Sequence, residues 1–254
     1  MLFEDFTAPI FASFLLKWPD LSSLQKIPVT RLRAFFYAQG SRRSKRIEER
    51  LDQIVNAQAL TTDAALIDPS ALMAQTLARV LQALHKGIAP IEEQIQESMD
   101  EHPDAPLFRS FPGAGPVMAP RLLAAFGTDR NRFQSALELQ QYYGIAPVRK
   151  QSGRSQLVHM RYRCPKFGRQ SFHENAAQAL KETGWAKNYY HQQRGNKKGH
   201  HASVRSVAFK LMRIYFACWQ SNTCYDAAQY EKSLRARGST LLKMVENSTA
   251  KNCE

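Results

Sequence analysis

The chain has 254 residues, a formal net charge of +13 and a sequence pI near 9.8. Its hydrophobic fraction of 44% is enough for a folded core and excludes a wholly disordered protein. No run of about eighteen apolar residues occurs, so we expect no membrane-spanning helix. The basic balance favours a polyanionic partner, with nucleic acid and an anionic membrane surface as the two candidates.

The N-terminal residues lack the basic region of a signal peptide, since two acids precede the first apolar run. The four cysteines have neither Cys-x-x-Cys nor zinc-knuckle spacing; they are Cys164, Cys218, Cys224 and Cys253. This spacing predicts reduced thiols in a cytoplasmic protein.

Residues 1–41 are predicted to hold short helices, capped near Asp20 and Thr30, in what we interpret as a junction following another domain. A helix is expected over residues 42–60. Its apolar face comprises Ile47, Leu51, Ile54 and Val55. The run from Thr61 to Pro69 predicts a break.

A longer periodic segment completes a helical linker over residues 42–105. Apolar residues recur at threes and fours over more than three heptads: Met73, Leu77, Val80, Leu81, Leu84, Ile88, Ile91, Ile95 and Met99. This spacing predicts a coiled-coil-like helix, kinked at Pro90 because proline removes a backbone donor. Periodicity leaves two partners open: the preceding helix, in a hairpin, or a second copy of the chain.

Residues 106–220 form the predicted main domain, beginning after the helix-ending run from His102 to Pro106. Its first motif is Phe111-Pro-Gly-Ala-Gly-Pro, flanked by apolar residues at helical spacing. Such a turn exposes amides that can bind a DNA phosphate, as in a helix-hairpin-helix motif. Gly113, Gly115 and Arg121 are therefore predicted DNA contacts. The alternative is a tight corner between two helices.

A basic segment follows a helix that begins with Ser135 and Glu138 as a capping box. It has seven cations and no acid between Leu139 and His173: Arg149, Lys150, Arg154, Arg161, Arg163, Lys166 and Arg169. We predict that all seven contact DNA. Ser152 lies among them in a predicted loop. A serine in such a setting could serve phosphoryl transfer, or could simply be a turn serine beside a phosphate-binding patch.

A short hairpin strand is predicted over residues 156–163, carrying Arg161 and Arg163 outward. Aromatic residues and cations then alternate from Trp185 to His201, which is typical of a nucleic-acid surface. The predicted DNA contacts in this run are Arg194, Lys197 and Lys198. Its histidines lack a fourth ligand at metal spacing, so no zinc site is expected.

The fold class that follows is mainly α, with a long helical linker, a helical domain containing the helix-hairpin-helix, and a short β-hairpin. A helix over residues 202–219 is predicted to bury one apolar face: Val204, Val207, Ala208, Leu211, Ile214 and Tyr215. Arg205, Lys210 and Arg213 lie on its other faces. Residues 221–254 are expected to be a tail with one amphipathic run and a frayed end.

Taken in order, these motifs resemble insertion-sequence transposases of the family numbered one hundred and ten, with its relatives one-one-six and nine-zero-two. The resemblance rests on Phe111-Pro-Gly-Ala-Gly-Pro, Ala119-Pro-Arg-Leu-Leu, Gly144-Ile-Ala-Pro, Gln151-Ser-Gly, Trp185-Ala-x-x-Tyr-Tyr and Val204-Arg-Ser-Val-Ala-Phe-Lys. It is dense from about Phe108 to Trp219 and weaker towards the N-terminus.

The resemblance implies a two-part bacterial recombinase. A RuvC-like domain binds magnesium through four acids, and a C-terminal domain supplies a serine that becomes joined to a DNA phosphate. That serine corresponds to Ser152. The resemblance also implies a structured guide RNA and a multimer as partners, and no membrane.

The chain departs from the family pattern because it begins at about where the RuvC-like domain should end, so we expect that domain to be missing. Its acids lie on the predicted linker helices, where a solvated helix face explains them better than a magnesium site: Asp63, Asp68, Glu92, Glu93, Asp100 and Asp104. No cofactor is therefore expected in this chain, and magnesium is implied only for the RuvC-like domain. We expect a transposase fragment that is inactive alone. The alternative is a non-catalytic helix-hairpin-helix module that binds DNA and dimerises.

Overall fold

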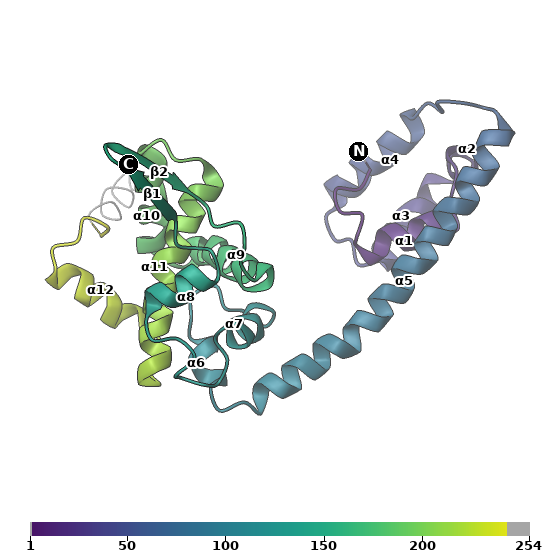
Figure 1. The fold of residues 1–254 in the computed structure, drawn as a ribbon. Coiled ribbons are helices and arrows are strands. Elements are labelled where there is room, and N and C mark those ends of the chain that lie inside the picture. Colours follow the sequence, from purple (N-terminus) through teal and green to yellow (C-terminus); the bar gives the residue numbers. More distant parts are fainter. Residues whose placement is uncertain (1, 243–254) are drawn as a thin grey trace, which may run out of the picture. The chain divides into compact units, whose positions relative to one another are not determined.

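The computed structural model describes residues 2–242, and these form twelve helices and a two-stranded sheet (Figure 1). The mainly helical class with a short hairpin is thus confirmed. Two compact units divide between Gln94 and Ile95, before the predicted boundary at residue 105. None of the described helices is long and apolar enough to cross a membrane.

The first unit is helical, with its own core. Its elements are α1 (Pro9–Lys17), α2 (Leu21–Gln25), α3 (Val29–Ala38), α4 (Ser44–Asn56) and the larger part of α5 (Ala64–Asp100). Asp20 caps α2, because its carboxylate accepts a hydrogen bond from the Ser23 amide at 2.8 Å. Aromatic side chains dominate the core, where Phe14, Trp18 and Phe36 are buried. Residues 1–41 supply most of this core.

The apolar face predicted for residues 42–60 is confirmed at three positions and wrong at one. Ile47, Leu51 and Ile54 are buried, but Val55 is 59% exposed. The helix ends at Asn56, and Ala57 is already extended.

The helix α5 begins earlier than expected and continues through Pro69 and Pro90. Of the break predicted over residues 61–69, only residues 61–63 therefore lie outside the helix. Proline at position 69 leaves the Ala65 carbonyl without its helical donor, which water can replace because both residues are exposed. The Asp63 carboxylate accepts from the Ala65 amide at 2.9 Å and so orders the start of the helix.

Two faces of α5 differ in their environment. Ala78 is fully buried, and Gln75 and Gln82 donate hydrogen bonds to Leu16 and Ser13 of the α1 region. Seven of the nine periodic apolar residues lie on another face and are 45–64% exposed: Met73, Leu77, Val80, Leu84, Ile88, Ile91 and Ile95. The other two differ, since Leu81 is partly buried and Met99 is only 2% exposed. We call these seven residues the α5 stripe. None of the seven belongs to a buried core of the described residues. The choice between the preceding helix and a second copy as partner of this segment stays a prediction.

The second unit surrounds one central helix, α11 (Figure 1). Its elements are α6 (Ala105–Arg109), α7 (Met118–Phe126), α8 (Ala136–Tyr142), β1 (Val148–Ser152), β2 (Ser155–His159), α9 (Lys166–Glu182), α10 (Gly184–Gly195), α11 (His200–Ser221) and α12 (Ala227–Ala236). The predicted inner face of α11 is confirmed at five positions, Val204, Val207, Ala208, Leu211 and Tyr215, while Ile214 is only partly buried. It packs against α8, α9 and α10. Ser135 caps α8 as predicted, since the Glu138 amide donates to its hydroxyl at 3.2 Å. The reciprocal bond of a capping box is not formed, because the Glu138 carboxylate accepts from the Gln134 amide at 2.7 Å.

The expected frayed end of the tail lies outside the described residues, as does Cys253. The amphipathic run before it forms α12, with Leu234 buried against the unit. The other three cysteines are free thiols.

Candidate nucleic-acid interface

The Phe111–Pro116 turn joins α6 to α7, as predicted, but its first glycine faces inward. Gly113 is buried, and its amide donates a hydrogen bond to the Glu182 carboxylate at 2.6 Å. This amide, predicted to meet a phosphate, is therefore occupied by a carboxylate from the end of α9. Binding a phosphate there would require Glu182 to leave.

The rest of the turn is anchored on α9 and α11. The Pro112 carbonyl accepts hydrogen bonds from the Asn175 amide at 3.0 Å and the Tyr215 hydroxyl at 3.1 Å. The Phe111 ring stacks on Tyr215, with ring centroids 4.0 Å apart. Burial raises the pKa of Tyr215 well above its ordinary value, so the hydroxyl remains a donor. The N-terminal half of the turn is thus a tightly held structural corner.

The C-terminal half of the turn faces solvent. Gly115 is exposed, with open space where a Cβ would lie, and Val117 is 64% exposed. The phosphate-binding prediction at Gly115 stays a prediction, and the geometry permits it.

Arg121 lies on α7 but does not project freely. Its guanidinium donates to the Glu174 carboxylate at 2.6 Å and to the Ser171 hydroxyl at 3.1 Å, both on α9. Its charge is thus largely compensated within the protein, and its side chain links α7 to α9. Its role as a DNA contact stays a prediction.

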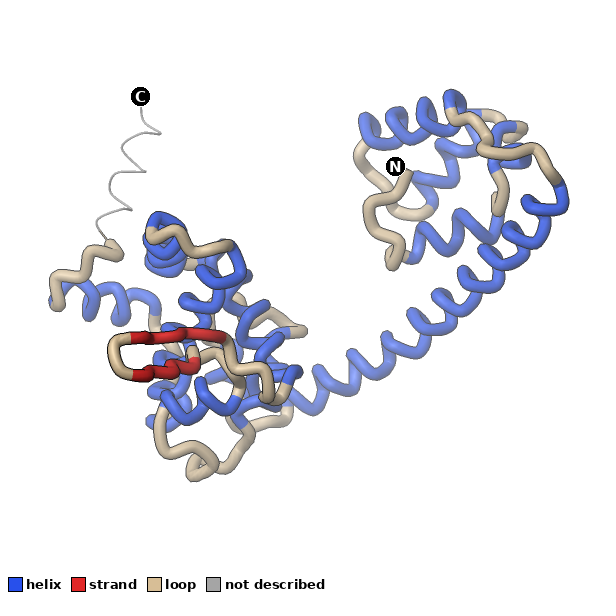
Figure 2. Tube along the Cα trace, turned by 45° about the horizontal axis from the view of Figure 1, so that its top comes forward, coloured by secondary structure: helices blue, strands red, loops and turns tan. Residues whose placement is uncertain are grey.

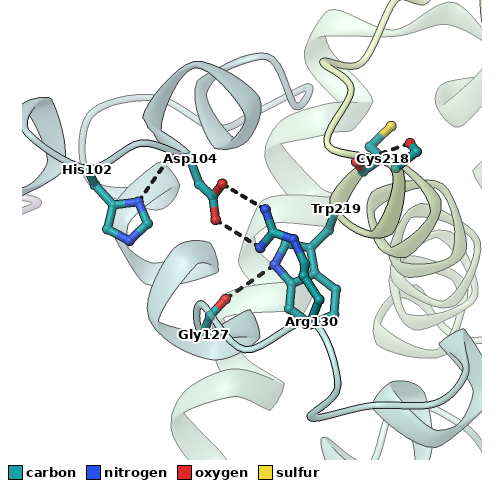
Figure 3. A network of polar contacts seen from close by, with 7 residues as sticks. His102, Asp104, Gly127, Arg130, Cys218 and Trp219 are labelled. Atoms are coloured by element: carbon teal, nitrogen blue, oxygen red, sulfur yellow. Dashed lines mark hydrogen bonds and ion pairs between the residues drawn. The ribbon is translucent and has the colours of Figure 1, made fainter.

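A polar network fixes the outer ends of α6 and α7 (Figure 3). The Asp104 carboxylate accepts two hydrogen bonds from Arg130, at 2.7 and 2.9 Å. The Arg130 guanidinium lies 4.9 Å from the centre of the Trp219 ring, and the Trp219 indole donates to the Gly127 carbonyl at 3.2 Å. Only 8% of Asp104 is exposed. The interpretation of Asp104 as part of a solvated face was therefore wrong, because its partner Arg130 comes from a loop distant in sequence.

Ser152 is the last residue of β1, where the sequence predicted a loop. Its antiparallel partner is Ser155, and the two-residue turn between them consists of Gly153 and Arg154. Gly153 has φ +55°, as the first central position of a type II′ turn requires. The Ser152 side chain is exposed and forms no hydrogen bond to another side chain in residues 2–242. Figure 2 shows the hairpin in red, with its turn at the outer end.

The base of the hairpin is closed by a tight contact between its two flanking segments. A Cβ at Gly144 would lie 2.7 Å from the Cys164 sulfur, so only glycine permits this approach. The second strand ends at His159, which places Arg161 and Arg163 in the following loop. The prediction that a strand carries these two arginines was wrong in this respect, although both are exposed.

Most predicted phosphate contacts remain available to a ligand. Ten cations take part in none of the ion pairs of the described residues: Arg149, Lys150, Arg154, Arg161, Arg163, Lys166, Arg169, Arg194, Lys197 and Lys198. The first three surround Ser152 on the hairpin. Cations that no carboxylate compensates form the electrostatic footprint of a phosphate partner.

The segment after α10 brings Lys198 close to α11. Lys197 has φ +59°, an uncommon value for a residue with a side chain, and the Lys198 carbonyl accepts from Arg194 at 2.9 Å. Trp185 was grouped with rings available for stacking, but it is only 1% exposed. It belongs to the core because its face of α10 packs on α11.

Three histidines gather beside this segment. The rings of His173 and His201 lie 5.6 Å apart, and those of His200 and His201 lie 5.1 Å apart. Burial, together with the nearby Arg205 charge, lowers the pKa of His173. Among residues 2–242, no three histidine, cysteine or acidic side chains are arranged to hold a metal ion.

Sequence reasoning missed a cavity at the base of the hairpin. Arg205, Tyr189, Ala202 and Phe209 line it, together with Arg149 and Lys198. Arg205 was assigned only to an outer face of its helix. The sequence does contain a signal for this role. No acid occurs between Thr183 and Tyr225, so Arg205 has no nearby carboxylate along the chain with which to form an ion pair.

The sequence of this chain is similar to those of insertion-element proteins. Residues 105–191 match the sequence model of the family described as Transposase IS116/IS110/IS902 family. The match covers α6 to α8, the hairpin, α9 and most of α10. This confirms the resemblance drawn from the motifs.

Three insertion-element proteins are similar over long stretches. A Streptomyces coelicolor protein, named as the transposase of the mini-circle IS117, is 28% identical over 87% of this chain and 53% of its own length. The IS900 42 kDa protein of Mycobacterium paratuberculosis is 26% identical over 83% and 52%. The IS110 43.6 kDa protein of S. coelicolor is 29% identical over 61% and 38%. The chain thus spans between 38% and 53% of the length of these three relatives.

Proposed function

We propose that this chain, which carries a transposase domain of the IS116/IS110/IS902 family in residues 105–191, serves DNA transposition by gripping DNA and supplying a serine nucleophile. The hairpin is the observation that supports this most directly. It holds Ser152 exposed beside a two-residue turn, two residues from Arg154 and two from Lys150. An accessible hydroxyl in a field of uncompensated cations suits attack on a phosphodiester.

The reaction would be a transesterification. The Ser152 oxygen forms a bond to phosphorus while a phosphorus–oxygen bond to one deoxyribose breaks, and the leaving oxygen becomes a hydroxyl. Rejoining reverses these steps. Nearby arginine and lysine side chains would stabilise the additional negative charge on the phosphate oxygens.

Activation of Ser152 needs groups beyond those described here. A serine hydroxyl is a weak nucleophile until a base or a metal ion activates it. The acids of residues 2–242 do not fit a magnesium site, since none cluster with metal-ligand geometry. Magnesium chemistry would therefore come from acids outside these residues, as the family resemblance implies, and the chain alone should be inactive.

The nucleophile can be tested by covalent trapping. The chain is mixed with a labelled insertion-end duplex, magnesium, and a longer family member whose own serine has been replaced. We expect an adduct of this chain's size, lost in Ser152→Ala and kept in Ser155→Ala. Ser155 is the matched control because it lies directly opposite Ser152 in the hairpin.

Equal adduct yields from the wild type and Ser152→Ala would remove Ser152 as the nucleophile. Salt-dependent duplex binding without any adduct, under every complementation, would instead favour the alternative: a non-catalytic DNA-binding and dimerisation module. The two functions share the basic surface and differ only in the chemistry at Ser152.

A structured guide RNA is the second proposed partner. The family resemblance suggests it, and the uncompensated cations after the hairpin and after α10 provide phosphate contacts that RNA can use as readily as DNA. Binding measured with matched DNA and RNA hairpins distinguishes the two partners. Affinity for DNA alone would remove RNA from this proposal.

A second copy of the chain is the proposed partner of the α5 stripe. Seven apolar side chains at helical spacing are half-exposed along one face, a pattern typical of helix–helix association. Leu84→Glu places a charge in the stripe and should convert a dimer into a monomer in sedimentation experiments. Lys86→Glu, at an exposed position on another face, should leave the mass unchanged. A monomeric wild type would contradict this assignment.

A further inference from the structure

A cavity of about 530 Å³ lies at the base of the hairpin in the second unit. Its walls come from the loop at residues 144–147, the inner ends of β1 and β2, and the facing sides of α10 and α11. Its volume falls within the roughly 300–1,000 Å³ typical of small-molecule sites. None of the predicted roles for this region uses this space.

One part of the lining is apolar and aromatic. Ile145, Pro147 and Val158 contribute from the hairpin side, and Tyr189 and Phe209 from the helices. Tyr189 is half-buried, and Lys210 lies 5.1 Å from the centre of its ring. A phosphate alone would need no such walls, because surface cations are enough to bind it.

The other part of the lining is cationic. Arg149 lines the cavity from β1, Lys198 from the loop between α10 and α11, and Arg205 from α11, and no acid lines it. None of the three takes part in an ion pair within residues 2–242. Arg205 is half-buried with Arg169 nearby, and both effects lower its pKa. A partly buried arginine without a carboxylate indicates a site built for an external anion.

We propose that this cavity holds one unstacked nucleotide of a bound nucleic-acid strand, with its base against the apolar walls and its phosphate between Arg149, Lys198 and Arg205. The inference rests on the proposed function, since it needs a nucleic-acid partner. A nucleotide matches both parts of the lining. Its flat, largely apolar base suits the aromatic and apolar walls, and its anionic phosphate suits the three cations. Stacking of bases on protein rings tolerates any sequence, because every base has a π face.

The test measures binding of DNA hairpins that carry a single-nucleotide bulge, with either a normal base or an abasic residue at the bulge. The wild type should bind the normal bulge at least about fivefold more tightly than the abasic one, as expected for one base–aromatic stack. Ala202→Trp fills the cavity from an exposed position in the first turn of α11 and should bring this ratio close to one.

Two variants control this result. Ala228→Trp adds the same side chain at an exposed position of α12 outside the cavity and should keep the wild-type ratio. Ala202→Leu, a smaller obstruction, should lower the ratio partially, and it replaces Ala202→Trp if tryptophan impairs folding. Affinity for a fully paired duplex should stay within about twofold in all variants, because the exposed cations are retained.

The same measurement on RNA hairpins with these bulges shows whether a DNA or an RNA nucleotide enters the cavity. A preference for the base over the abasic residue in DNA, RNA or both supports the inference and assigns the source of the nucleotide. A wild-type ratio of one in both, or a ratio that survives both Ala202 variants, overturns it while leaving duplex binding intact. Absence of binding to any nucleic acid would instead overturn the proposed function, and this inference with it.

Discussion

Replacing Gly113 by alanine should destabilise the second unit by about 2–5 kcal/mol, through backbone strain and overlap in a packed core. Gly113 has φ +74°, and an added Cβ would lie 2.7 Å from the Ala179 backbone nitrogen and 2.9 Å from the Gln178 Cβ. Neither neighbour can move away cheaply, because both belong to α9. Urea denaturation followed by tryptophan fluorescence would measure the loss.

Gly115→Ala is the matched control. Gly115 lies in the same turn, has no positive φ, and has no atom within 4 Å of its Cβ position. The Gly115→Ala substitution should therefore change the free energy of unfolding by less than about 0.5 kcal/mol. Equal stabilities of the two variants would contradict the description of this turn as a structural corner.

The pair of variants also separates folding from binding. A bulky residue at Gly113 would weaken DNA binding through misfolding alone, so it cannot report on a phosphate contact. A bulky residue at Gly115 changes only the solvent-facing half of the turn. Unchanged duplex affinity of a folded Gly115→Leu variant would remove the phosphate-binding prediction for the turn.

Removing the Asp104 carboxylate should also destabilise the second unit strongly. Asp104→Ala leaves the Arg130 guanidinium without its two hydrogen bonds, although the Trp219 ring remains beneath it. Breaking a buried ion pair from one side costs about 3–5 kcal/mol. Because the Arg130 side chain is 27% exposed, we expect about 2–4 kcal/mol. The shift of the urea midpoint would measure this loss.

The surface pair Asp100–Arg109 provides the comparison for Asp104. Both side chains are largely solvated, at 62% and 45% exposure. Asp100→Ala should therefore cost less than about 1 kcal/mol, since exposed ion pairs contribute little. If Asp104→Ala were equally mild, the network of Figure 3 would not be what fixes the ends of α6 and α7.

Local chemistry made several features predictable from the sequence. Asp20 and Ser135 start helices because each side chain accepts from an amide three residues later. The buried face of α11 follows from the spacing of its apolar residues. The seven cations around Ser152, and the order of motifs that resembles one transposase family, are likewise properties of the sequence and needed no fold.

Contacts between distant residues decided the rest. Whether the Gly113 amide faces a phosphate or a protein carboxylate depends on Glu182, which is 69 positions away. The ion pair that compensates the Arg121 charge comes from Glu174 on α9, and Trp185 is buried in the core against α11, neither of which local sequence shows. The cavity requires the hairpin, α10 and α11 together. The sequence by itself determined the elements, the basic character and the family resemblance, because periodicity, capping and charge are local. Only the tertiary structure decided which amides and cations stay free for a ligand, because their partners lie on other elements.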